Sequence, residues 1–218
     1  MAAGAAAVFL GWRVVAAGEA SVWLVMTSIL VAAGVGAVAT GRVGLSPRLR
    51  WPWALPAGAV AGALLYVATA AFVLVVRRWP VFDRHVAEIY DQRRGLPLGM
   101  AFVLAALLTA PGEELFWRGL FQGRLAASWG WPAASMATWG AYIGANSASG
   151  SLPILAGAVV SGAVWGALAL WTHGVLASLT CHSVWTGLMI LRPPGGPAER
   201  GRDDAVHPGT SPPGEGPG

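Results

Sequence analysis

Long stretches of this sequence contain no charged residue. Ala20–Gly41 and Trp51–Val76 are both uncharged, and each exceeds the roughly 20 residues that an α-helix needs to cross a bilayer. A third region, Gly95–Leu191, holds 97 residues and only four formal charges. Runs of this length and composition are typical of a polytopic membrane protein. The sequence therefore predicts an all-α, polytopic transmembrane helix bundle of about six to seven helices.

The charge content is too low for a soluble domain. Only 11% of the 218 residues are charged, whereas soluble domains carry roughly 25%. The net charge is +4, but the charges separate apolar runs and do not form a basic face, so we expect no nucleic-acid partner. The single cysteine, Cys181, excludes an intrachain disulfide framework and a multi-cysteine zinc site.

Four further helices are expected in the apolar region that follows residue 95. The first begins at Leu98, passes Pro111 and continues as a polar helical turn to Arg124. The other three are Trp129–Ala145, Leu152–Trp171 and Gly174–Leu191. Pro97, Pro132 and Pro153 lie near three of the four expected starts, where a missing backbone N–H is tolerated best.

Two segments admit more than one interpretation. Arg77–Arg94 is rich in charge but carries apolar residues at roughly helical spacing, so it is either an amphipathic helix at the membrane surface or a solvated loop. Met1–Trp12 is apolar but short, and is a tilted first span, an interfacial segment or part of an uncleaved signal anchor.

The chain divides into three parts by composition. Residues 1–95 carry the N-terminal transmembrane helices and the amphipathic segment, and residues 96–192 form an apolar core with a few polar side chains. Residues 193–218 are rich in Pro, Gly and Ser with almost nothing apolar, which predicts a disordered tail. An excess of Arg places the tail and Arg77–Arg94 on the cytoplasmic side of the membrane.

Two adjacent carboxylates stand out at the end of an apolar span. Glu113 and Glu114 are followed by Arg118, which is four residues after Glu114 and so lies on the same helix face. We expect these two residues to pair, which leaves Glu113 as a candidate general base. The alternative is a helix-start carboxylate pair that stabilises the helix dipole, with Arg118 as an interfacial anchor.

Other polar residues fall within or beside the later spans. His182 lies in the middle of the last one, and Thr186 follows it by one turn. Asn146 ends an earlier span, where it is either a site residue or a helix cap. Because isolated charges inside a membrane cost a few kcal/mol each, we expect Glu113, Arg118 and His182 to converge on one cavity. His173 is not expected to act on the same atom as His182, since on one helix the two would lie on opposite faces. No catalytic role is expected of His85 and His207, which lie in polar segments.

Together these motifs resemble the CPBP family of intramembrane metalloproteases, which includes the CAAX proteases and is also called the Abi family. The family carries EExxxR, then FxxxH, then HxxxN or HxxxD. The first motif is matched in full at Glu113, Glu114 and Arg118. The second position holds Tyr142-x-x-x-Asn146, with Asn in place of His, and the third holds His182-x-x-x-Thr186.

The resemblance implies an integral membrane endopeptidase, which we expect in a bacterial-type plasma membrane, acting on a peptide or protein substrate beside the lipid bilayer. It makes Glu113 the base that activates water, while Glu114 and Arg118 organise the site. His182, with its partner one turn on, either holds Zn or another divalent metal or stabilises the oxyanion, and Asn146 and Thr186 are both weak candidates for the partner. Two alternatives stay open: an impaired pseudoprotease acting as a scaffold or immunity factor, and a small transporter with a proton relay through Glu113, Glu114 and His182.

Overall fold

The computed structural model describes residues 1–76, 78–91 and 96–194. Within these residues all regular structure is helical, which confirms the predicted all-α bundle. Most of the tail that was expected to be disordered, residues 195–218, lies outside the described residues. The segments are α1 (Ala2–Ala16), α2 (Val22–Ala39), α3 (Trp51–Val76), α4 (Pro80–Asp91), α5 (Leu98–Phe102), η1 (Val103–Thr109), α6 (Ala110–Glu114), η2 (Leu115–Gln122), α7 (Gly123–Trp129), α8 (Trp131–Ser147), α9 (Leu152–Thr172) and α10 (Leu176–Leu191).

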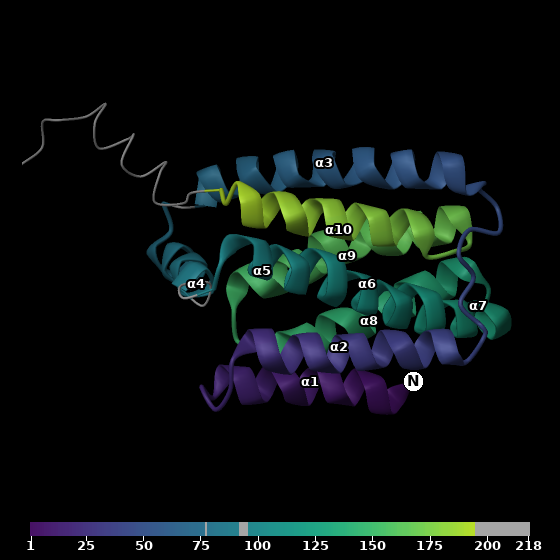
Figure 1. The fold of residues 1–218 in the computed structure, drawn as a ribbon, viewed down its shortest axis with the longest axis horizontal. Coiled ribbons are helices and arrows are strands. Elements are labelled where there is room, and N and C mark those ends of the chain that lie inside the picture. The colour runs from purple at the N-terminus through teal and green to yellow at the C-terminus, as the bar shows by residue number, and fades with distance from the viewer. Residues whose placement is uncertain (77, 92–95, 195–218) are drawn as a thin grey trace, which may run out of the picture.

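Four of the described helices are long and apolar enough to cross a membrane. They are α2, α3, the continuous helix Leu98–Trp129 that α5 to α7 form together, and α9. The apolar helices α1 and α10 are shorter. In Figure 1, α3 and α10 lie side by side along one edge of the bundle and α1 and α2 along the opposite edge, with the remaining long helices between them. The chain is thus a helical membrane bundle.

The helix Leu98–Trp129 contains two π-helical stretches, η1 and η2, on either side of the short α6. Pro111 lies just after η1. A proline lacks the N–H that an α-helix needs and its ring crowds the carbonyl four residues earlier, and a wider π turn relieves both problems. The helix therefore passes Pro111 and runs to Trp129, five residues beyond the expected end of its polar turn at Arg124.

The other helix bounds differ from the prediction only at their ends. The span Trp51–Val76 is as predicted. The helix expected to begin at Trp129 begins at Trp131, because Gly130 has a φ of 75° and breaks the chain's helical path. The last helix begins at Leu176 and not at Gly174, because His173 has a φ of 53° and ends α9.

Both ambiguous segments are helices. The N-terminal segment forms α1, which packs against α2 and α8 as part of the bundle. The charged segment forms α4, so the loop interpretation of Arg77–Arg94 is wrong for its described part. Phe82 and Val86 on α4 are buried, and the Phe82 ring meets Phe72 of α3 edge to face at 5.6 Å. The apolar side of α4 therefore packs on the end of the bundle (Figure 1).

Close approaches between helices are made at glycines. An ideal Cβ on Gly34 of α2 would lie 2.7 Å from the Cα of Gly112 in α6, and one on Gly112 would overlap the carbonyl oxygen of Leu30. On the other side of the bundle, Gly58 and Gly62 of α3 leave the same kind of room for the backbone of α10. Small residues of this kind let membrane helices pack backbone to backbone.

We expect Gly112→Ala to lower the stability of the bundle by about 1–3 kcal/mol, because the added methyl group meets backbone that has nowhere to move. Thermal unfolding in detergent measures this effect. Gly36→Ala on α2 is the matched control, since a Cβ there meets nothing within 4 Å. Equal unfolding temperatures for the two variants would contradict the close α2–α6 contact.

Candidate active site

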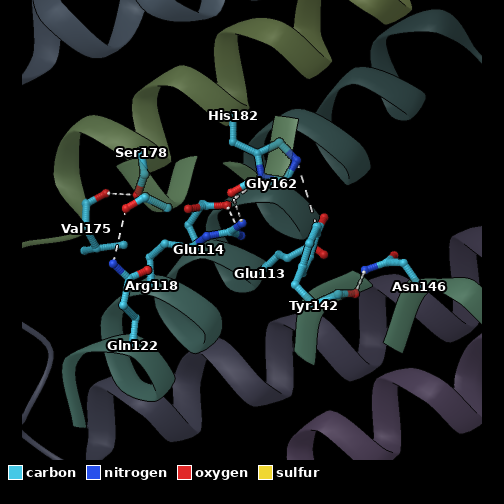
Figure 2. A network of polar contacts seen from close by, with 11 residues as sticks. Glu113, Glu114, Arg118, Gln122, Tyr142, Asn146, Gly162, Val175, Ser178 and His182 are labelled. Carbon is cyan, nitrogen blue, oxygen red and sulfur yellow. Dashed lines mark hydrogen bonds and ion pairs between the residues drawn. The ribbon is translucent and has the colours of Figure 1, made fainter. Parts of the chain in front are cut away.

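The two adjacent carboxylates lie in the short α6, between the two π-helical stretches. Glu114 is fully buried and Glu113 is 8% exposed. Because they are neighbours on a helix, their side chains point about 100° apart. Figure 2 shows the consequence: Glu114 faces Arg118 and the α10 side, while Glu113 points toward Tyr142.

Glu114 and Arg118 form the predicted pair. The Nη1 atom of Arg118 donates to Oε1 of Glu114 at 2.9 Å, and its Nη2 donates to the carbonyl oxygen of Gly162 in α9 at 3.1 Å. Both side chains are almost completely buried. The guanidinium also lies over the ring of Tyr142, 4.6 Å from its centroid. Pairing and hydrogen bonding together offset the cost of burying the two charges.

His182 joins the carboxylates from α10. Its Nδ1 lies 3.0 Å from Oε1 of Glu114. Its Nε2 lies 3.9 Å from Oε2 of Glu113. The ring is stacked on Trp165 of α9, with centroids 3.6 Å apart. Since a carboxylate only accepts hydrogen bonds, the Nδ1 atom carries the hydrogen, and in the neutral ring Nε2 is free to accept one.

A cavity of about 510 Å³ opens beside this cluster. Glu113, His182, Thr186 and Asn146 line it, and its other walls are mainly apolar side chains of α1, α2, α3, α4, α8 and α9. Glu113 and His182 therefore converge on one cavity, as predicted. Arg118 does not line it, so that part of the prediction is wrong: its guanidinium is turned to Glu114 and Gly162, behind the cavity wall.

Asn146 and Thr186, the two weaker site candidates, differ in whether their side-chain polar atoms have hydrogen-bond partners. Both polar atoms of the Asn146 amide have hydrogen-bond partners. Its Oδ1 accepts from Nε1 of Trp12 at 2.9 Å, and its Nδ2 donates to the carbonyl oxygen of Tyr142 at 2.9 Å. Asn146 also lies within α8 and is not its C-cap. The hydroxyl of Thr186, in contrast, is buried without a partner among the described residues.

Three aromatic residues of the site were not identified as functional from the sequence. The sequence indicated Tyr142 only as the aromatic residue of the second motif. Its side chain lies beside Glu113 in Figure 2 and lines the same cavity. Trp165 stacks on His182, and Trp12 binds Asn146. No spacing pattern connects α1 to α8, so only the fold could show the Trp12 contact.

The described histidines outside the cluster have other surroundings. His85 accepts a hydrogen bond from the backbone N–H of Leu152, at the start of α9. His173 stacks on Trp131 with centroids 4.4 Å apart. Desolvation lowers the pKa of His173 and the nearby charge of Arg48 lowers it further. His207 lies outside the described residues.

The residues present do not fit a zinc site. No group of three His, Cys, Asp or Glu side chains in the described part of the chain is arranged to hold a metal ion. Glu114 is engaged by Arg118 and His182, and the Asn146 oxygen by Trp12. That leaves Glu113 and the Nε2 of His182, whereas catalytic zinc is usually held by three protein ligands.

Comparison with known families gives a match in the central part of the chain. Residues 96–188 match the family described as type II CAAX prenyl endopeptidase Rce1-like. The match contains the Glu113–Arg118 cluster, Asn146 and His182. Neither a curated protein nor a solved structure gives a significant match to the chain.

Proposed function

We propose that this chain is an intramembrane endopeptidase in which Glu113 activates water, because residues 96–188 match the Rce1-like type II CAAX prenyl endopeptidase family. One observation carries this proposal. The Oε2 of Glu113 and the Nε2 of His182 face each other at 3.9 Å on the wall of a largely apolar cavity. The two atoms are too far apart for a direct hydrogen bond and well placed to share a water molecule.

The chemistry follows from these positions. A water about 2.8 Å from each of the two atoms is within hydrogen-bond reach of both, so it donates one hydrogen to Glu113 and one to His182. Glu113 takes a proton as the oxygen attacks the substrate carbonyl carbon. The Thr186 hydroxyl, buried and unpartnered among the described residues, donates to the oxyanion. Glu113 then returns its proton to the leaving nitrogen.

His182 is held for this role by its surroundings. Hydrogen bonding of Nδ1 to Glu114 fixes the ring tautomer. Stacking on Trp165 fixes the ring plane. Glu114 is itself held by Arg118. Glu114 and Arg118 are thus positioning residues that act through His182, and neither lines the cavity that would receive a substrate.

The experiment that tests this function is cleavage of a peptide library by the purified protein in detergent, compared with Glu113→Gln. Because the described donor set does not fit zinc, we expect cleavage to persist after treatment with EDTA, within about a factor of two of the untreated rate. Loss of cleavage on chelation, with recovery on adding Zn²⁺, would contradict the metal-independent mechanism and leave the endopeptidase function standing.

A catalytically inactive membrane scaffold is the second candidate. The observation that favours it is the state of Asn146, whose amide is bound on both sides by Trp12 and the backbone of Tyr142. An amide held in this way stabilises the contact between α1 and α8 and offers nothing to a reaction. Cleavage that depends on Glu113 would exclude this candidate.

A further inference from the structure

An open apolar groove lies on the outer face of α3, apart from the candidate active-site cavity. Its volume is about 600 Å³, and it is lined by Leu49, by a row of α3 residues from Trp53 to Leu64, and by Trp171 near the end of α9. Among the described residues, none lines both the groove and the cavity. Trp53 is 68% exposed and Leu64 is 65% exposed, so the groove offers apolar surface to whatever surrounds the bundle.

The groove has the length of one membrane leaflet. Trp53 and Leu64 are eleven residues apart on α3, which is about 16 Å at a rise of 1.5 Å per residue. The hydrocarbon core of a bilayer is about 30 Å thick, so one leaflet contributes about 15 Å. The groove begins near the first residue of α3 and ends near the middle of that helix. These dimensions fit a lipid acyl chain that runs from the membrane surface to the bilayer midplane.

Exposed arginines lie at the surface end of the groove. Arg48 and Arg50 are both exposed and flank Leu49, which lines the groove. The backbone N–H of Arg48 donates to the carbonyl oxygen of Thr172 at 3.2 Å, which places Arg48 beside the end of α9 where Trp171 lies. Arg50 immediately precedes α3. Both elements that form the groove therefore have an arginine at this end.

The α2–α3 loop that carries these arginines is bound to the turn between α9 and α10. The backbone N–H of Val175 donates to the carbonyl oxygen of Gly44 at 3.0 Å, and that of Leu176 donates to the carbonyl oxygen of Leu45 at 2.8 Å. Figure 1 shows the loop at the end of the bundle opposite α4. Because the loop backbone is already fixed, a ligand that binds Arg48 does not have to order it first.

No described acidic residue lies at this end of the bundle. Glu19 is in the turn before α2, and the acidic residues of α4 follow the far end of α3, so all of them lie at the opposite end. Glu113 and Glu114 are buried in the interior. The positive charge at the groove is therefore uncompensated by the described carboxylates. Arginine binds phosphate through two parallel hydrogen bonds, and tryptophan rings such as those of Trp53 and Trp171 gather at the level of lipid headgroups.

We propose that the groove binds an anionic phospholipid of the surrounding bilayer, with its phosphate held by Arg48 and Arg50 and an acyl chain lying along α3 from Trp53 to Leu64. The phosphate supplies the charge that the arginines lack, and the chain covers the exposed apolar side chains. This inference goes beyond the proposed function and does not depend on it, so a protein that cleaves no peptide leaves the lipid site testable.

The test is native mass spectrometry of the delipidated full-length protein, titrated with phosphatidylglycerol or with phosphatidylcholine of the same acyl chains. The dissociation constant of the first bound lipid should be lower for phosphatidylglycerol. Replacing both Arg48→Gln and Arg50→Gln should weaken phosphatidylglycerol binding about 25-fold, since each arginine near an anionic membrane surface contributes a factor of about five. The matched control replaces Arg78→Gln and Arg84→Gln, two exposed arginines at the opposite end of the bundle, and should change the affinity less than twofold.

A second pair of variants tests the groove itself. Ala57 lines the groove, so Ala57→Phe fills part of it and should weaken phosphatidylglycerol binding at least fivefold, because the chain loses apolar contact. Ala63→Phe is the matched control, since Ala63 is an exposed residue of α3 that does not line the groove. Unfolding temperatures show whether both variants fold. Val60→Trp, at a groove position that is 60% exposed, replaces Ala57→Phe if that variant does not fold.

Three results would overturn the inference. One is equal affinity for the two lipids, or an equal loss of affinity in the two arginine double variants. Another is unchanged binding in a folded groove-filling variant, because the headgroup would then be held without a chain in the groove. The third comes from the oligomeric state, which the same spectra report: a delipidated dimer that becomes a monomer in Val60→Arg would place a second copy of the chain on the groove.

Discussion

Glu113→Gln should abolish peptide cleavage and leave the fold intact. The amide has nearly the shape of the carboxylate but cannot take a proton from water, so we expect a loss of about 10²- to 10⁴-fold in kcat, the usual contribution of a general base. The side chain lies 3.9 Å from His182 and lines the cavity. The measurement is the initial rate of cleavage of the best library peptide in detergent.

Glu19→Gln is the matched control for this variant. Glu19 is exposed, in the turn between α1 and α2, so its replacement should change neither the rate nor the unfolding temperature. If Glu113→Gln kept the wild-type rate while His182→Ala lost it, the base would have to be the imidazole. That result would contradict the role given to Glu113.

Arg118→Met should destabilise the bundle more than any surface substitution. It leaves the buried carboxylate of Glu114 without its cation and the Gly162 carbonyl without its added donor. Removing one partner of a buried ion pair typically costs 3–5 kcal/mol, about the same as a large cavity in a core. We therefore expect a clear drop in the unfolding temperature in detergent and a reduced yield of folded protein.

Two further variants serve as comparisons for Arg118→Met. Arg124→Met removes an exposed arginine six residues further along the same helix and should change the unfolding temperature little. Arg118→Lys keeps the charge but loses the planar two-point geometry that reaches both Glu114 and Gly162. The stability of this variant should therefore lie between that of Arg118→Met and that of Arg124→Met. Equal losses for Arg118→Met and Arg124→Met would contradict a structural role for the buried pair.

The sequence predicted what depends on local spacing. Uncharged runs indicated the membrane helices, since a bilayer sets their length. Four-residue spacing on one helix was enough to predict the contact of Glu114 with Arg118. The meeting of Glu113 with His182 was predicted from the cost of isolated intramembrane charges, although the two residues lie on different helices.

Contacts between distant segments could not be predicted in this way. Trp12 and Asn146 are 134 positions apart, and nothing in either neighbourhood indicates the other. The stacking of Trp165 on His182 depends on how α9 meets α10. Arg118 was expected in the cavity because it is charged, but its hydrogen bond to Gly162 turns it away. In each case the helix packing, and not the local sequence, determines what the side chain contacts.

The walls of the cavity have a consequence for how this protein can vary. The family match covers residues 96–188 and contains the proposed catalytic side chains, while Trp12 and side chains of α2, α3 and α4 form part of the surrounding wall. The proposed catalytic side chains thus all come from the matched segment, whereas the chamber wall is built from residues before it as well as within it. If the proposed function holds, we expect substitutions at the lining residues before residue 96 to change which substrates the chamber admits while leaving every proposed catalytic side chain in place.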